Sequence, residues 1–408
     1  MRRRLAPRPD WVDIVAEQGL VYCWTEGPDG INRPYWDESI CYAFDRAEVD
    51  QLERAAADLW DLCIEAGDLM VSQGWLERIG IPKEAHDLVR RSWDTEPPSL
   101  YGRFDLRYDG TGPAKLLEFN ADTPTSLLEA AAIQWFWLED CFPEADQWNS
   151  IHDRLVAKWR DIAESWKPDG PVHVCWTEAE ESGEDMMNVG YVAETARQAG
   201  LDVVLLPIEE LGWDYRQERF VDLENLPVRM LFKLYPWEWA IDDPFGMFAL
   251  ETLWIDPVRE PDPHQGRGTI WVEPIWKMLW SNKALLAALW EVAPGHPNLL
   301  PAYLDGPHDL VDYAVKPFLG REGANVTLVR GGDVLVEGPD QEYGSEGFVH
   351  QGLALLPDFD GTHPVLGVWL VDGEPAGLGV RESDSLITDN LSRFIPHLID
   401  GNTPGGTT

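Results

Sequence analysis

The chain has few basic residues, few cysteines and no long apolar segment. Only 32 of its 408 residues are lysine or arginine, against 72 aspartates and glutamates, so the formal net charge is −40. Such a charge repels nucleic-acid phosphates and anionic lipids, and we expect neither nucleic acid nor a membrane as a partner. It favours cationic partners weakly, since an acidic surface can also serve solubility alone. No run approaches the roughly 18 apolar residues of a membrane span.

The five cysteines are odd in number, widely spaced and free of CxxC pairs. This pattern predicts neither a disulfide framework nor a zinc site, and it fits a reducing cytoplasm. The basic N-terminus is not followed by an apolar segment, so no secretion signal is predicted. The length and a hydrophobic content of 44% predict a large globular enzyme with more than one subdomain. We expect a monomer or a homodimer.

A β-hairpin is predicted within the segment LYGRFDLRYDGTGPAKLLEFNADTPTSLLE. The alternation in YGRFDLRY puts Arg103 and Asp105 on one face, as the two-residue period of a strand requires. An Asp-Gly turn follows, and in the second strand, KLLEFN, Leu116, Glu118 and Asn120 share a face. Two carboxylates and a carboxamide are therefore expected to converge beside an arginine.

These side chains offer hard oxygen ligands of the kind that Mg²⁺ prefers, whereas zinc would require histidine or cysteine. Asp105, Glu118 and Asn120 are the predicted metal ligands. Arg103 fits the same chemistry, because phosphoryl transfer uses metals together with a fixed cation. An exposed hairpin edge with ordinary charges explains the periodicity equally well.

After the hairpin, Ser126 and Glu129 are predicted to form a capping box that opens the helix LLEAAAIQWFWLED. The free N–H groups of that helix, with the hydroxyls of Thr123, Thr125 and Ser126, could hold an anionic substrate group. Capping alone also accounts for Ser126.

The string LLEFNADTPTSLLEAA resembles the signature of the glutathionylspermidine synthase family, specifically its ATP-grasp synthetase domain. VEPIWKMLWSNKALL, HPNLLPAY, VKPFLGREGANV and GVRESDSLITDN match the family in the same order. The resemblance implies an α/β (α+β) protein with an ATP-grasp fold, in which antiparallel sheets enclose the nucleotide. Bifunctional members carry a further cysteine amidase domain. Since no cysteine here has a recognisable nucleophile context, we expect no amidase activity.

Five regions are expected along the chain. They are a mostly helical scaffold (1–95), the metal-binding hairpin with the helices after it (96–170), an α/β subdomain (171–260), the nucleotide-binding region (261–400) and a disordered tail (401–408). The α/β subdomain is predicted from the strand PVHVCWT, a helix and the strand LDVVLLPI, an order that places a ligand at the carboxyl end of a strand.

An acidic loop lies at that strand end, with five carboxylates within eight residues: Glu178, Glu180, Glu181, Glu184 and Asp185. Spaced carboxylates suit the ammonium groups of a diamine or polyamine, although a solvated charged loop is an equally good explanation. The resemblance implies that this loop forms the amine site, with Glu180 and Glu181 as the predicted amine ligands.

The segment 265–330 is predicted to bind the nucleotide. Ser281 can cap the helix NKALLAALWEV, an apolar strand delivers Lys316, and GREG forms a mobile loop whose backbone can approach a triphosphate. The resemblance aligns Lys283 and Lys316 with lysines that bind the nucleotide phosphates. Arg321, Gly323 and Gln351 are predicted to bind ATP with them.

A second hairpin is predicted to turn at Asp372-Gly373 and to deliver Arg381, which the resemblance places with Arg103 and Arg321 as a catalytic cation. The predicted function is an ATP-dependent carboxylate–amine ligase with two Mg²⁺ ions, acting on small molecules through an acyl phosphate. Two alternatives stay open: a non-catalytic nucleotide- or polyamine-binding protein on the same scaffold, and an ATP-grasp ligase that joins amino acids or peptides.

Overall fold

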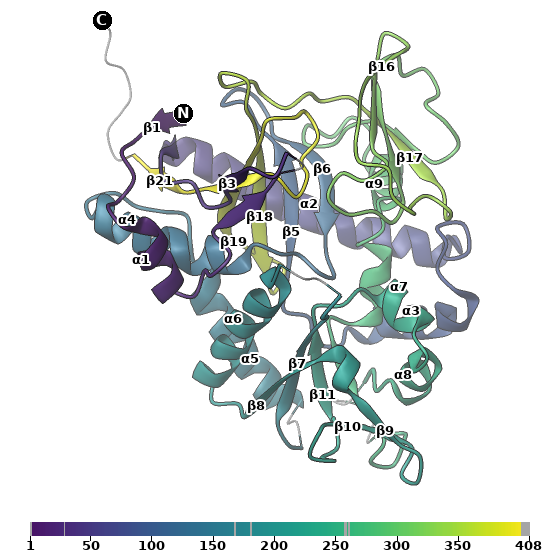
Figure 1. Cartoon of the computed structure of the whole chain (residues 1–408). Helices are drawn as coiled ribbons and strands as arrows, with labels where there is room; N and C mark the ends of the chain where they lie inside the picture. Colours follow the sequence, from purple (N-terminus) through teal and green to yellow (C-terminus); the bar gives the residue numbers. More distant parts are fainter. Residues whose placement is uncertain are drawn as a thin grey trace, which may run out of the picture.

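A five-stranded antiparallel sheet carries the predicted hairpin. The computed structural model describes residues 2–27, 29–166, 169–179, 182–256, 259 and 262–400 (Figure 1). The strand order is β20-β19-β18-β5-β6. These strands are β5 (Tyr101–Arg107), β6 (Lys115–Asn120), β18 (His363–Val371), β19 (Glu374–Ser383) and β20 (Arg393–Ile395). Both predicted hairpins, β5–β6 and β18–β19, are confirmed.

A second antiparallel sheet of five strands has the order β13-β17-β14-β15-β16. Its members are β13 (Ala302–Tyr303), β14 (Tyr313–Pro317), β15 (Thr327–Arg330), β16 (Asp333–Glu337) and β17 (Phe348–Gly352). The short helix η4 (Ile275–Leu279) and α9 (Leu285–Val292) precede it in the chain. The sheet lies beside α9 at the opposite end of Figure 1 from the parallel sheet described next.

A parallel sheet of order β12-β11-β7-β8 forms the α/β part of the molecule. It consists of β7 (Val172–Trp176), β8 (Val203–Pro207), β11 (Met230–Lys233) and β12 (Ile270–Val272). Helix α6 (Glu184–Gln198) crosses between β7 and β8 and packs on α5 (Ile151–Trp166). The predicted strand-helix-strand unit is thereby confirmed. Shorter elements complete this part: η3 (Ile208–Glu210), β9 (Gly212–Asp214), β10 (Arg219–Val221), α7 (Trp237–Asp242) and α8 (Gly246–Thr252).

The N-terminal region combines helices with short strands. Its elements are β1 (Arg2–Arg4), α1 (Trp11–Glu17), β2 (Trp24–Glu26), β3 (Asn32–Pro34), β4 (Ile40–Phe44), α2 (Arg46–Ser72), η1 (Lys83–Ala85) and α3 (His86–Thr95). Strand β4 pairs with both β1 and β21 (His397–Ile399), which brings the two ends of the described chain together. Helix α2 begins at a capping box of Asp45 and Glu48.

Two predicted helix caps are wrong. The π-helix η2 (Glu129–Ile133) continues into α4 (Gln134–Cys141), but the Glu129 carboxylate accepts hydrogen bonds from two tyrosine hydroxyls, and Ser126 lies in the left-handed region at φ 66°. Before α9, Asn282 rather than Ser281 accepts the hydrogen bond of a backbone N–H group. The Glu129 side chain is bound by tyrosines that are distant in the sequence, so it does not cap the helix. At α9 the cap is the residue after the predicted one.

A buried lysine ties both ends of the β5–β6 hairpin to the helical layer beneath it. Lys277 donates to the backbone carbonyls of Tyr101 and Ala121, each at 2.9 Å, and lies 3.1 Å from the Glu273 carboxylate. Glu273 in turn accepts from the backbone N–H groups of Leu100 and Tyr101. Both charged side chains are at most 1% exposed, so each depends on the other for compensation.

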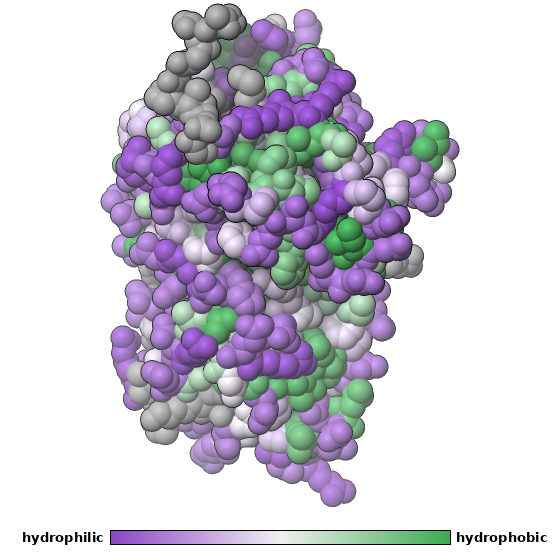
Figure 2. Space-filling view, turned by 90° about the vertical axis from the view of Figure 1, so that its left-hand side faces the viewer, coloured by the Kyte–Doolittle hydropathy of each residue, from purple (hydrophilic) through white to green (hydrophobic). Residues whose placement is uncertain are grey.

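The surface agrees with the acidic composition. The face shown in Figure 2 is mainly hydrophilic, with small hydrophobic patches between polar regions. Within the described ranges, no helix is both long and apolar enough to cross a membrane.

Replacing Lys277 with methionine is expected to lower the free energy of unfolding by on the order of 3–5 kcal/mol, because the Glu273 carboxylate stays buried without its cation. Urea titration followed by tryptophan fluorescence measures the change. Lys83→Met, at an exposed position, is the matched control and should change the free energy by less than about 0.5 kcal/mol. Equal losses in the two variants would contradict the role given to Lys277.

Candidate active site

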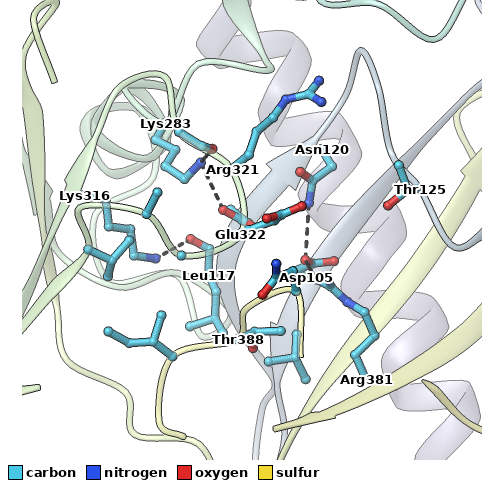
Figure 3. A pocket seen from close by; sticks show the side chains of 18 of the residues that line it. Asp105, Leu117, Asn120, Thr125, Lys283, Lys316, Arg321, Glu322, Arg381 and Thr388 are labelled. Atoms are coloured by element: carbon cyan, nitrogen blue, oxygen red, sulfur yellow. Dashed lines mark hydrogen bonds and ion pairs between the residues drawn. The ribbon is translucent and has the colours of Figure 1, made fainter. Parts of the chain in front are cut away.

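A cavity of about 660 Å³ lies where four parts of the chain meet. Both antiparallel sheets line it, through Asp105 and Arg381 from one sheet and Lys316 from the other. The start of α6 and the N-terminal segment around β2 and β3 supply further walls. Figure 3 shows Asp105 and Arg381 on one side of the cavity, and Lys283 and Lys316 on the other. Cations and carboxylates that are far apart in sequence thus face a common space.

A β-bulge changes which residues of β6 face the cavity. Asp105 pairs with Glu118, whereas the next residue, Leu106, pairs with Leu116, so the register shifts between them. Leu117 and Glu118 therefore both face the cavity, and Leu116 is fully buried in the core. The prediction that Leu116 shares a face with Glu118 was wrong, because strict alternation does not hold across a bulge.

The Asp105 carboxylate is the centre of the charged network. Arg103 donates to both of its oxygens, at 2.7 and 3.1 Å, and Arg381 donates to Oδ2 at 2.8 Å. Asn120 donates to the same oxygen at 3.2 Å. Asp105 is 2% exposed and Arg103 5% exposed, so these are buried charges with bidentate pairing. Gly367 leaves room for Arg103, since a Cβ atom there would lie 2.8 Å from the arginine Cδ.

Glu118 belongs to a second ion pair, with its Oε2 atom 3.2 Å from Lys283 Nζ. Burial raises the pKa of Glu118, but nearby cations outweigh this effect and lower the pKa to about 2. In order of effect these cations are Lys283, Lys316 and Arg381. Glu118 is therefore ionised at neutral pH and available to a cation.

Lys316 and Gln351 join the two antiparallel sheets. Lys316 donates to the Leu117 carbonyl and to Gln351 Oε1, both at 2.8 Å, and Gln351 donates to the Leu116 carbonyl at 2.9 Å. Burial lowers the pKa of Lys316 to about 8, with Glu118 opposing the shift. This lysine has no carboxylate bonded to it directly in the described structure, so an anionic ligand would stabilise its charge.

The GREG loop lies against the cavity through Arg321. Its guanidinium donates to Thr123 Oγ1 at 2.5 Å and stacks over the Trp239 ring at 4.9 Å. Lys283 donates to the Gly320 carbonyl at 2.7 Å, which ties the loop to the Glu118 pair. Gly323 has φ 69°, and a Cβ atom there would lie 2.4 Å from Ile387, so only glycine fits.

Only some of the predicted substrate-binding residues line the cavity. Thr123 and Thr125 line the cavity, whereas Ser126 is 4% exposed and lies 3.2 Å from the Tyr35 hydroxyl, outside the lining. Glu180 and Glu181 fall outside the described residues. Two other carboxylates of the acidic loop, Glu184 and Asp185, do line the cavity.

The sequence analysis missed a wall built by the N-terminal segment. Tyr22, Trp24, Glu26 and Tyr35 line the cavity, although the region was expected to be scaffold. The segment has no periodicity that points to a site, and its contact with the cavity arises only from tertiary packing. The available signal was composition, because four aromatic and four acidic residues lie within 22–38.

The donor set fits a magnesium ion that arrives with a phosphate ligand. Among the described residues, no group of three or more histidine, cysteine, aspartate or glutamate side chains is arranged to hold a metal. Asp105, Glu118 and Asn120 offer two carboxylates and an amide. Mg²⁺ typically takes one or two protein carboxylates and completes its shell with water and substrate phosphates, so the set is sufficient.

Comparison with known proteins agrees with this site. A family model described as glutathionylspermidine synthase preATP-grasp matches residues 2–400. A Haemophilus influenzae protein with the provisional name acid–amine ligase is 38% identical over 401 residues, which cover 96% of this chain and 97% of that protein. A solved structure of a glutathione synthetase-like effector from Globodera pallida, in apo form, covers 96% of this chain and 98% of its own, with a TM-score of 0.51 at 10% identity. That likeness shows a shared fold.

Two further relatives are longer than this chain. Trypanothione synthetase of Crithidia fasciculata is 31% identical over 326 residues. The match covers 77% of this chain and 49% of that protein. The bifunctional glutathionylspermidine synthetase/amidase of Escherichia coli K12 is 26% identical over 372 residues. The match covers 88% of this chain and 59% of that protein. The chain thus spans about half of these two relatives.

The family match and the relatives define the class first: the chain is an ATP-dependent carbon–nitrogen ligase. It belongs to the glutathionylspermidine synthase family. The synthetases of this family depend on ATP and Mg²⁺, which agrees with the donor set and the cations of the cavity.

Replacing Lys283 with methionine is expected to raise the pKa of Glu118 from about 2 toward its ordinary value of 4.5, since burial is then opposed by fewer cations. A ¹³C NMR titration of the Glu118 carboxyl carbon measures the shift. In the wild type, the lowered pKa of Glu118 contributes to the free energy of unfolding above pH 4.5, and this contribution is lost as the pH falls toward 2. In Lys283→Met the contribution should be smaller and should be lost at a higher pH.

Lys115→Met is the matched control for this titration. Lys115 lies on the same hairpin but donates to the Pro297 carbonyl, so the pKa of Glu118 should not change. An unchanged Glu118 pKa in Lys283→Met would contradict the electrostatic role of Lys283.

Proposed function

We propose that the protein joins a carboxylate to an amine by way of an acyl phosphate. The observation that carries this proposal is the convergence, in one cavity, of Asp105, Glu118 and Asn120 with five cations. These cations are Arg103, Arg321, Arg381, Lys283 and Lys316. Carboxylates do not react with amines unaided in water because the oxygen leaving group is poor. Transfer of the γ-phosphoryl group of ATP to the carboxylate supplies a leaving group, with release of ADP.

The nucleotide would bind between the two antiparallel sheets, as in an ATP-grasp fold. Lys316 and Gln351 come from the second sheet, Lys283 precedes α9, and Gly323 lies in the GREG loop. Supporting this arrangement, apolar side chains line the same part of the cavity and suit a purine ring. They include Val326, Leu328, Leu355 and Ile387.

Asp105, Glu118 and Asn120 would hold two Mg²⁺ ions, which neutralise phosphate charge when they are bound. Both carboxylates are already held among cations, so their geometry is fixed before any ligand arrives. Arg103 and Arg381 offset charge on the transferring phosphoryl group, and Arg321 approaches it from the loop. The chain's own cations therefore carry the electrostatic part of catalysis.

The substrates are a peptide or amino-acid carboxylate and an amine or polyamine. The relative named for glutathionylspermidine supports this class, since that name denotes a peptide joined to a polyamine. Thr123 and Thr125 can donate hydrogen bonds to the acid substrate, and the acidic loop suits the amine. Glu184 and Asp185 are the amine-side carboxylates that reach the cavity in the described structure.

ADP release from MgATP tests the proposal, with pooled amino acids and peptides, pooled amines, and then both together. Release that requires both pools supports a ligase and lets the pools be divided to find the substrates. Equal release without the amine pool would contradict amide formation. Tight ATP binding without release under any mixture would favour a nucleotide-binding protein instead.

Asp105→Asn and Glu118→Gln are expected to lower turnover by at least about a hundredfold, because each removes charge from the phosphoryl-transfer site. Asp109→Asn, in the turn of the same hairpin, is the matched control and should retain turnover. ADP release is measured beside thermal unfolding. Near wild-type turnover in Asp105→Asn would contradict the metal assignment.

The GREG loop is proposed to close over ATP and to exclude water, since an exposed acyl phosphate hydrolyses. Trypsin should cleave after Arg321 in the free protein, and MgATP should slow this cleavage several-fold. Cleavage after Arg216, in the exposed turn between β9 and β10, is an internal control that should not change. Equal cleavage after Arg321 with and without MgATP would contradict a lid.

A further inference from the structure

A buried carboxylate lies directly behind the N-terminal wall of the cavity. Glu129 is 0% exposed, and its Oε1 atom accepts hydrogen bonds from the Tyr22 hydroxyl and, at 2.7 Å, from the Tyr35 hydroxyl. Its other oxygen, Oε2, is buried without a hydrogen-bond partner in the described part of the chain. A carboxyl group left half satisfied in the interior is costly, which points to a role other than packing.

Glu184 is the first residue of α6, and its half-buried side chain lines the cavity. It lies close enough to Glu129 for the two charges to interact. Its carboxylate accepts a hydrogen bond from the Thr125 side chain. Burial, followed by the charge of Glu129, raises the pKa of Glu184 to about 8. The charged and titratable groups that face it come from five elements or segments and are Glu129, Asp185, Tyr22, Tyr35, Arg103 and Arg381.

An alkylamine reaches the protein as an ammonium ion, which has no lone pair with which to attack a carbonyl carbon. One proton must therefore leave before the new bond forms, and a group of the protein near the acyl carbon has to accept it. This requirement follows from the proposed ligase function, on which the present inference rests.

We infer that Glu184 is the catalytic base that takes this proton from the substrate ammonium. The ammonium transfers one proton to the Glu184 carboxylate and becomes a neutral amine. The nitrogen lone pair then forms the C–N bond to the acyl carbon as the C–O bond to phosphate breaks, and phosphate leaves with that electron pair. The second nitrogen proton passes to the departing phosphate, so that atoms and charges balance.

Asp105 and Glu118, two other carboxylates of the cavity, are poorer bases. The oxygens of Asp105 are occupied by two arginines and an asparagine, and the pKa of Glu118 is lowered to about 2. Glu184, by contrast, has two carboxylates and two tyrosines near it, and burial together with the carboxylates outweighs the effect of Arg381 on its pKa. A base operates best when its pKa lies near the working pH, which is the condition that this environment produces.

Glu129 acts through Glu184 and is a positioning residue. Its negative charge disfavours a second charge at Glu184, and the Tyr22 and Tyr35 hydroxyls fix its orientation. The N-terminal segment, which supplies both tyrosines, therefore tunes the amine side of the site.

The test compares two nucleophiles in Glu184→Gln, whose amide cannot accept a proton. The wild type and the variant receive MgATP, the carboxylate pool, and either an alkylamine pool or hydroxylamine. Hydroxylamine is largely uncharged at neutral pH and attacks an acyl phosphate without a base, giving a hydroxamate that is measured by its iron complex. Glu194→Gln, on the exposed side of the same helix, is the matched control and should behave as the wild type.

The expected result is at least a hundredfold loss of alkylamine ligation in Glu184→Gln, with hydroxamate formation kept within about threefold of the wild type. Retained hydroxamate formation also shows that the variant folds and phosphorylates the acid. Equal losses with both nucleophiles, or ligation of alkylamine at the wild-type rate, would overturn the role of Glu184. A wild type that forms no hydroxamate with any acid would instead overturn the proposed ligase function.

The pH profile gives a second readout. In the wild type, kcat/KM for the alkylamine should fall as the pH is lowered through about 8, because protonated Glu184 cannot act as a base. Glu129→Gln removes the neighbouring charge and should move this fall to lower pH, whereas a merely structural role would lower the rate without moving the profile. An unshifted profile would overturn the positioning role of Glu129.

Discussion

The buried carboxylate of Asp105 is the constraint on which the site depends. It accepts from Arg103 and Arg381, which come from strands far apart in the sequence, and it is almost excluded from solvent. Two arginines in such a place are stable only with a carboxylate between them. The same charges make the cavity ready for a polyphosphate, because Mg²⁺ and an anionic ligand can take over the pairing without a change of fold. In the proposed mechanism, the atoms that compensate these buried charges are also the atoms that take part in catalysis.

Two electrostatic environments share the cavity. On the side proposed to bind the nucleotide, lysines and an arginine lower the pKa of Glu118, so that it stays ionised. On the side proposed to bind the amine, burial and a neighbouring carboxylate raise the pKa of Glu184. The proposed reaction, in which a phosphoryl group moves first and a proton is accepted afterwards, needs both conditions. The wall between them is built by Arg103, which bonds Asp105 and the Thr125 carbonyl at the same time.

Much of the architecture could be predicted from the sequence, for local reasons. Alternating side chains and glycine-containing turns predicted both hairpins, since strand periodicity and turn geometry depend on nearest neighbours. The errors have two other causes, one of them local and one long-range. A bulge at Leu117 moved Leu116 into the core, and the tyrosine partners of Glu129 replaced the predicted cap at Ser126. Neither the bulge nor the long-range partners leave a periodic signal.

By itself, the sequence determined the strands and turns, the acidic excess and the set of cations and carboxylates around Asp105 and Lys316. Only the tertiary structure decided which acidic residues face the cavity and what stands behind them. Glu184 and the tyrosines of the N-terminal segment are over 140 residues apart in the chain, and packing alone brings them together. The physical reason is that secondary structure follows short-range steric and hydrogen-bond preferences, whereas the proton affinity of a buried group depends on every charge around it.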